Sequence, residues 1–122
     1  MMPRRRVAGR LERAVLVVDD NPIARAAAVD LFTDLGFRVH DSYDGAGALR
    51  LLRAHPGIGV LFVDVRMPGM TGPELAQAAV ALRPDLKVVF TSGYVDASTL
   101  PEAASFVPKP WTVAQVVDAI ET

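Results

Sequence analysis

The chain has 122 residues, with 13 Lys and Arg, 14 Asp and Glu, and no cysteine. This length allows one domain, and 51% hydrophobic residues can build a buried core, so general disorder is excluded. The net charge of −1 excludes a uniformly basic nucleic-acid binder, and the lack of cysteine excludes disulfides and cysteine zinc sites. No apolar run approaches the roughly 18–20 residues of a membrane-spanning helix. We therefore expect a cytoplasmic protein that contacts neither membrane nor nucleic acid directly.

Positive charge is concentrated at the start of the chain. Residues 1–13 hold five arginines and one glutamate, a net of +4 that leaves −5 for the rest. The apolar stretch that follows is too short for a secretion signal. We predict a basic flexible tail over 1–13, solvated rather than bound to phosphate or lipid, and one folded domain over 14–122.

Short segments rich in β-branched and aromatic residues alternate with helical patterns. A strand is predicted over 14–18, and the next helix begins at Asn21-Pro22 and ends before Gly36. We expect this helix to bury a stripe made of Ile23, Ala27, Leu31 and Leu35. A strand over 37–43, a helix capped by Asp44, a strand over 58–63 and a helix opened by Gly72-Pro73 follow.

The second half of the chain continues the alternation with one weak element. Strands are predicted over 86–91 and 105–108, and Thr112 caps a final helix. The segment 94–104 between these strands has room for little more than two helical turns, so we expect a short or irregular fourth helix. Five strand–helix units predict a flavodoxin-like (βα)5 three-layer sandwich with a parallel sheet in the order 2-1-3-4-5.

Polar side chains follow four of these strands at their carboxyl ends. They are Asp19 and Asp20, Asp64, Thr91 and Ser92, and Lys109. Because ligands bind at this edge of such sheets, we expect the side chains to converge there. Carboxylates without His or Cys indicate a hard cation, and an open site beside a lysine favours Mg²⁺, with Mn²⁺ as an option. The lysine would be a fixed positive charge for a phosphoryl group.

At these residues the sequence resembles the response-regulator receiver domain of two-component signalling. The resemblance rests on LVVDDNP (16–22), DVRMPGMTG (64–72), FTSGY (90–94) and FVPKP (106–110), and it covers 14–122. It implies that Asp64 accepts a phosphoryl group from a phosphohistidine on a sensor histidine kinase or histidine phosphotransferase. It also implies that hydrolysis later resets the domain, which is otherwise not an enzyme.

The resemblance also implies the roles of the other residues at the site. Asp20, Asp64 and the backbone carbonyl of Arg66 are similar to the family's Mg²⁺ ligands, and Asp19 would hold the ion directly or through water. Lys109 and the Thr91 hydroxyl would contact the phosphoryl group, with Ser92 as an alternative hydroxyl. The Lys109-Pro110 bond resembles the family's cis peptide.

Some assignments stay open at this level. Phe106 stands at the family's switch aromatic, where it would rotate between buried and exposed positions or serve as plain core. The Arg66 side chain would either contact the phosphoryl group or stay in solvent. His40 and His55 are interpreted as structural or surface residues, and Trp111 is expected to pack at the start of the last helix.

We interpret the chain as a phosphoacceptor receiver, stand-alone or excised from a hybrid kinase, without an output domain. It would act through a downstream protein target, and its oligomeric state stays open, with a weak dimer as one option. One alternative is an aspartate-dependent phosphohydrolase, which normally needs a second aspartate where Arg66 stands. The other is a receiver-like interaction module that is not phosphorylated.

Overall fold

One five-stranded parallel sheet forms the centre of the protein. The computed structural model describes residues 13–93, 100 and 104–121. The sheet order is β2-β1-β3-β4-β5, as the sequence predicted. The strands are β1 (Ala14–Val18), β2 (Arg38–Ser42), β3 (Ile58–Asp64), β4 (Lys87–Ser92) and β5 (Ser105–Pro108).

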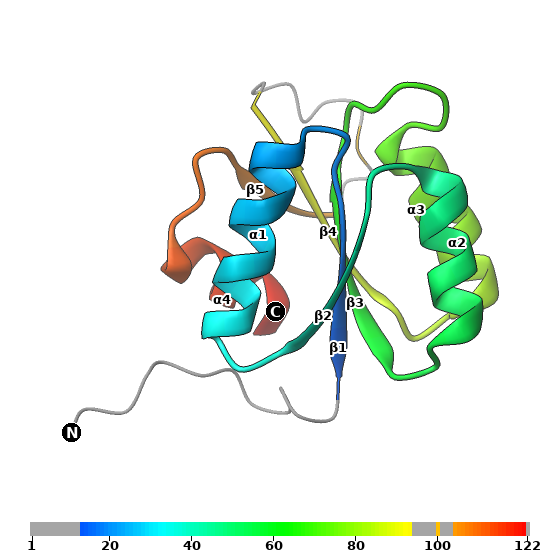
Figure 1. The fold of residues 1–122 in the computed structure, drawn as a ribbon, viewed down its shortest axis with the longest axis horizontal. Helices are drawn as coiled ribbons and strands as arrows, with labels where there is room; N and C mark the ends of the chain where they lie inside the picture. The colour runs from blue at the N-terminus through cyan, green and yellow to red at the C-terminus, as the bar shows by residue number, and fades with distance from the viewer. Residues whose placement is uncertain (1–12, 94–99, 101–103, 122) are drawn as a thin grey trace.

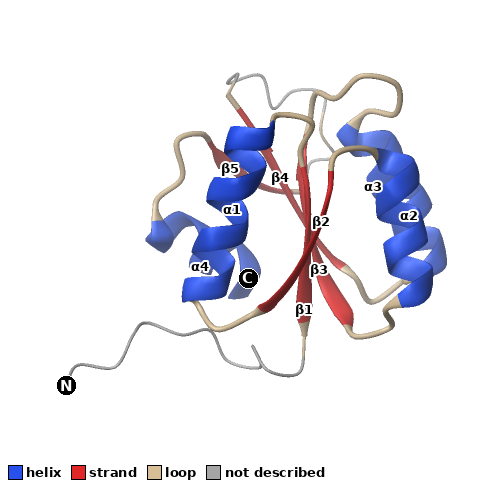
Figure 2. Cartoon of the chain, viewed as in Figure 1, coloured by secondary structure: helices blue, strands red, loops and turns tan. Residues whose placement is uncertain are grey.

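Helices cover both faces of this sheet. α1 (Pro22–Asp34) and α4 (Val113–Glu121) lie on one face, and α2 (Gly45–Ala54) and α3 (Gly72–Leu82) lie on the other (Figure 1). The helices form the two outer layers around the strands (Figure 2). This arrangement confirms the flavodoxin-like three-layer architecture.

The helices begin at polar side chains that satisfy free backbone N–H groups. The Asn21 side chain accepts from Ile23 N at 2.9 Å, and Asp44 accepts from Gly47 N at 2.8 Å, both as predicted. Thr71 and Glu74 form a reciprocal capping box at the start of α3, which the sequence analysis did not identify. These caps fix where each helix starts relative to the strand end before it.

Alternation along the strands divides the core into two clusters. On β1, Val15 and Val17 pack under α1 and α4, whereas Leu16 and Val18 pack under α2 and α3. Because both faces are covered, every residue of β1 is buried. Strands buried on both faces are continuous apolar runs, which is why the sequence predicted a strand at 14–18.

The predicted apolar stripe of α1 is wrong in its first half, whereas Leu31 and Leu35 do pack into the core as predicted. Ile23 is 81% exposed, and the helix instead buries Ala28 and Phe32, followed by Leu35 just beyond its end. Repeated four-residue steps drift around a helix of 3.6 residues per turn, whereas steps of four and then three stay on one face. Phe32 packs edge-to-face on Phe62 of β3, with ring centroids 5.0 Å apart.

Two further predictions concern segments that lie mostly outside the described residues. Residues 1–12 of the predicted tail lie outside the described residues. Most of the segment 94–104, where a short fourth helix is expected, also lies outside them. Among the helices that the structure describes, none combines the length and apolar character needed to span a bilayer.

Candidate functional site

The carboxyl ends of β1, β3 and β4 and the loop after β5 bring the predicted polar residues together. Asp19 and Asp20 follow β1, and Asp64 is the last residue of β3. Thr91 pairs with Asp64 in the β3–β4 register, and Val65 N donates to Thr91 O at 2.9 Å. Four separate segments therefore place their polar residues at one edge, as the sheet order predicted.

The Lys109 ammonium lies between two carboxylates. Its Nζ is 2.9 Å from Asp19 Oδ2 and 3.5 Å from Asp64 Oδ2. The Lys109-Pro110 peptide bond is cis, as the family resemblance implied, and Lys109 N donates to Ser92 O at 3.0 Å. The lysine is thus held beside the acids by both its backbone and its side chain.

Three carboxylates form a group that could hold a metal ion. Asp19, Asp20 and Asp64 each offer one oxygen, and these oxygens lie within 4.8 Å of one another. Asp19 is only 2% exposed, Asp64 is 8% exposed, and Asp20 is open to solvent. An all-oxygen donor set with one open side fits a hydrated hard cation such as Mg²⁺.

Burial and charge shift the pKa values of the central pair. Burial raises the pKa of Asp64, and the Asp19 carboxylate adds to this, while Lys109 and the Arg66 N–H act in the opposite direction without cancelling it. Burial alone would lower the pKa of Lys109, but the Asp19 and Asp64 carboxylates outweigh it and raise that pKa. The lysine therefore stays charged, and a proton competes with cations for Asp64.

The raised pKa of Asp64 predicts how its charge affects stability. A carboxyl whose pKa is raised by folding stabilises the fold fully below its unfolded value, here 3.8, and this contribution is lost as pH rises through the folded-state pKa. Asp64→Asn removes the charge but keeps the shape. In metal-free buffer at pH 7 we therefore expect the variant to be more stable than wild type, with solvent screening keeping the gain below about 1 kcal/mol.

Urea unfolding at a series of pH values measures this gain. The difference between Asp64→Asn and wild type should shrink as pH falls through the raised pKa of Asp64, where the wild-type carboxyl takes up its proton. Asp85→Asn is the matched control, because Asp85 is exposed in the turn before β4. A destabilised Asp64→Asn at pH 7 would contradict the direction of the pKa shift.

The two candidate hydroxyls lie on different faces of the sheet. Thr91 pairs with Asp64 in register and so shares its face, and it is 1% exposed. Ser92 is the next residue along β4 and therefore points toward the opposite face. This alternation favours Thr91 as the hydroxyl that reaches a group on Asp64.

Two residues at the site escaped the sequence analysis. Trp111 was expected only to pack, but its indole Nε1 donates to Thr91 Oγ1 at 2.6 Å. Arg25 of α1 donates from Nη1 to Asp19 O at 2.9 Å and pairs through Nε with Asp41 at 3.1 Å. The position of Arg25 one turn after the Asn21 cap was an available signal for its contact with the end of β1.

Phe106 and Arg66 lie at the places the sequence indicated. Phe106 of β5 pairs in register with Phe90 and packs, partly buried, against the cluster under α2 and α3. The Arg66 side chain is exposed, and its backbone N–H donates to Asp64 Oδ1 at 3.4 Å. Neither position decides between the roles left open for these residues.

His40 and His55 are neighbours in the structure, although the sequence analysis treated them as separate. Their rings stack with centroids 4.2 Å apart, between β2 and the end of α2. Burial lowers the pKa of His40, and His55 and Arg38 lower it further against the effect of Asp41. The stack brings the two rings together at the surface, where His55 is exposed and His40 is half-buried.

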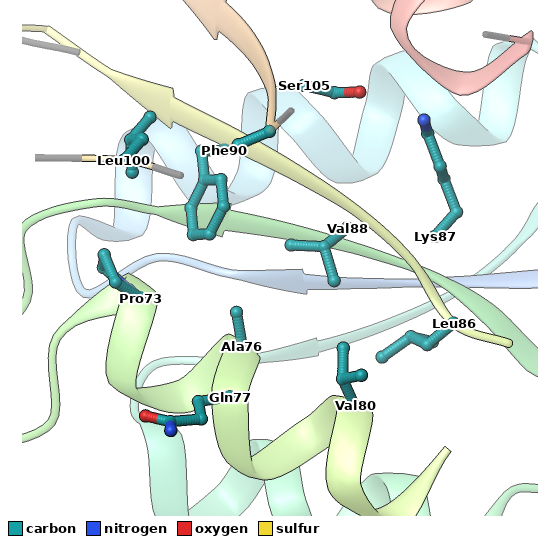
Figure 3. Close-up of a pocket in the computed structure, with 11 residues that line it drawn as sticks. Pro73, Ala76, Gln77, Val80, Leu86, Lys87, Val88, Phe90, Leu100 and Ser105 are labelled. Atoms are coloured by element: carbon teal, nitrogen blue, oxygen red, sulfur yellow. The ribbon is translucent and has the colours of Figure 1, made fainter. Parts of the chain in front are cut away.

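A groove of about 860 Å³ lies between α3 and β4, apart from the acidic group (Figure 3). Its walls are mostly apolar and include Val80 of α3 and Val88 and Phe90 of β4. Leu100 and Ala104, which flank the undescribed residues 101–103, also line it. None of the predicted metal or phosphoryl ligands lines this groove.

The family model of the response regulator receiver domain matches residues 15–121. The chain belongs to this family. The receiver domain is 32% identical over 116 residues to the response regulator receiver protein CpdR of Brucella abortus (strain 2308), and the match covers 91% of this chain and 95% of CpdR. It is 33% identical over 113 residues to the sensor kinase CckA of the same organism, covering 88% of this chain but only 12% of the kinase.

Solved structures agree with this assignment. A two component transcriptional regulator AraC from Clostridium phytofermentans ISDg superposes on the receiver domain with a TM-score of 0.77 at 35% identity, covering 89% of each chain. Receiver domains are signalling modules of two-component systems that interact with histidine kinases and phosphotransfer proteins, and the family typically binds Mg²⁺. Membership favours neither a phosphohydrolase nor a module that is not phosphorylated.

Proposed function

We propose that this receiver domain acts in the cytoplasm and carries a phosphoryl group on Asp64, taken from a phosphohistidine of a sensor histidine kinase or histidine phosphotransferase. The observation that supports it most is the position of one Asp64 carboxylate oxygen 3.5 Å from the Lys109 ammonium, within a group of three carboxylates. An anionic nucleophile that attacks an anionic phosphoryl group needs positive charge on both sides of the reaction. Lys109 is one such charge, and the acidic group can hold another.

The proposed transfer to Asp64 forms one bond to phosphorus and breaks another. A carboxylate oxygen of Asp64 forms a bond to phosphorus, and the bond from phosphorus to the donor's imidazole nitrogen breaks. The electron pair stays on the imidazole nitrogen, which takes up a proton. Hydrolysis resets the domain: a water oxygen bonds to phosphorus, the bond from phosphorus to the Asp64 oxygen breaks, the electron pair stays on the carboxylate, and inorganic phosphate leaves with the proton of the water released to solvent.

Mg²⁺ fits the donor set beside Asp64. We propose Asp20, Asp64 and the backbone carbonyl of Arg66 as its ligands, with Asp19 bound directly or through water. When bound, the ion supplies positive charge to the phosphoryl oxygens. Lys109 would contact the transferred group from the other side, and Thr91 would donate a hydrogen bond to it.

Phosphorylation by a small phosphodonor tests this proposal. The wild-type protein incubated with acetyl phosphate and Mg²⁺ should gain the mass of one phosphoryl group, and Asp64→Asn should gain none. Chelation of the metal should also remove the adduct. Asp85→Asn, which changes an exposed acid remote from the site in the fold, should be modified like wild type.

Three results would contradict the proposal. An adduct that persists in Asp64→Asn would place the phosphoryl group on another residue. A folded wild-type protein that gains no adduct in the presence of Mg²⁺ would favour the interaction module that is not phosphorylated. Catalytic turnover of a small phosphoester would instead favour a phosphohydrolase.

A further inference from the structure

The hydroxyl of Thr91 accepts a hydrogen bond from the indole of Trp111. Trp111 Nε1 and Thr91 Oγ1 are 2.6 Å apart, and Thr91 is 1% exposed. These residues lie on different segments, Thr91 near the end of β4 and Trp111 in the turn between β5 and α4. The buried Thr91 side chain cannot change its χ1 rotamer without losing this hydrogen bond, because the oxygen would move away from the indole.

The indole itself is held in place from the side of β3. Its ring packs edge-to-face on Phe62, with centroids 5.4 Å apart and planes at 67°. Phe62 lies two residues before Asp64 on the same strand and therefore on the same face. Trp111 also lies two residues after Lys109, whose Nζ is 5.9 Å from the indole centroid. The Trp111 ring thus contacts β3, the strand that ends in Asp64, and lies close to Lys109 both in sequence and in space.

The chemistry of this hydrogen bond leaves the hydroxyl available. An indole N–H is a donor only, so the Thr91 oxygen must accept, which uses one lone pair and leaves its own proton free to be donated. Accepting a hydrogen bond also strengthens a hydroxyl as a donor. Trp111 therefore fixes the position of the oxygen without using the proton that a phosphoryl group would need.

We propose that Trp111 is a positioning residue that holds the Thr91 hydroxyl oriented toward a phosphoryl group on Asp64. The inference rests on the proposed function, because it assigns Trp111 a part in the same transfer. Phenylalanine at this position would keep most of the ring packing on Phe62 but would lack the N–H. The substitution therefore separates positioning from packing.

Kinetics in a double-mutant cycle test the proposal. Trp111→Phe should slow phosphorylation by acetyl phosphate about three- to tenfold, the range expected for one lost hydrogen bond. In a Thr91→Val background, where no hydroxyl remains to be held, Trp111→Phe should change the rate no further. Thr91→Ser, which keeps a hydroxyl, should keep part of the sensitivity to Trp111→Phe. Equal slowing in both backgrounds would mean a merely structural role and would overturn the proposal.

A spectroscopic measurement reports on the hydrogen bond directly. The chain contains one tryptophan, so an ¹⁵N-labelled sample gives a single indole N–H signal. Thr91→Val should move this signal toward the position of a weaker hydrogen bond, and Mg²⁺ with beryllofluoride, a phosphoryl mimic, should move it in the wild-type protein. An indole signal that ignores both changes would overturn the proposal even if Trp111→Phe does not fold.

The outcomes separate this inference from the proposed function. A wild-type protein without an adduct on Asp64 removes both. A normal adduct on Asp64 that forms at the same rate in Trp111→Phe removes the role of Trp111 and leaves the phosphoacceptor in place.

Discussion

Lys109→Met is expected to slow phosphorylation of Asp64 by about a hundredfold or more while it tightens Mg²⁺ binding. Removal of one fixed positive group that stabilises a developing anion costs about this much in rate. The same ammonium lies 2.9 Å from Asp19 Oδ2 and 3.5 Å from Asp64 Oδ2, so it repels any cation bound by those carboxylates. Its removal should strengthen Mg²⁺ binding on the order of tenfold.

Two measurements distinguish these opposite effects. Mass spectrometry of the adduct against time gives the phosphorylation rate, and titration of the single tryptophan's fluorescence with Mg²⁺ gives the affinity. Lys87→Met is the matched control, because Lys87 begins β4 at the opposite end from Thr91. Weaker Mg²⁺ binding in Lys109→Met, or an unchanged rate, would contradict the position assigned to the lysine.

Gly72→Ala should both destabilise the fold and disturb the acceptor. A Cβ at Gly72 would lie 2.3 Å from the Asp64 carbonyl oxygen and 2.9 Å from Val65 Cα. These are backbone atoms that cannot swing aside, so the start of α3 or the end of β3 must move. We expect a loss of about 2–3 kcal/mol in the free energy of unfolding.

The loss should be accompanied by slower phosphorylation, because the displaced backbone carries Asp64. Urea unfolding and the acetyl phosphate reaction measure the two effects. Gly57→Ala is the control, since a Cβ there would meet nothing within 4 Å. Gly72→Ala with wild-type stability would show that the loop between β3 and α3 relaxes freely, against the close contact described.

The backbone geometry of the loop after β3 explains several residues of the motif DVRMPGMTG. Gly69 has a positive φ of 77°, where a side chain would be strained, and Gly72 lies against the end of β3. Met67 is 7% exposed and packs in the cluster under α2 and α3. The loop is therefore shaped by backbone contact and packing around the residue that is proposed to react.

The sequence by itself determined the order of the elements and the edge at which the polar residues meet. Strands buried on both faces are continuous apolar runs, as at 14–18, and helix starts carry capping side chains such as Asn21 and Asp44. These signals are local to each segment. Because the strands are parallel, their carboxyl ends lie at one edge of the sheet, where Asp19, Asp64 and Lys109 meet. The cis Lys109-Pro110 bond followed from the resemblance to the family.

Only the tertiary structure decided which side chains touch. The Trp111–Thr91 hydrogen bond, the His40–His55 stack and the face that α1 buries depend on register and on distances between segments far apart in the chain. Periodicity in one segment carries no information about its partner, so these contacts had no reliable sequence signal. The proposed preference for Thr91 over Ser92 also rests on the β3–β4 register, because a shift of one residue reverses the face of every side chain.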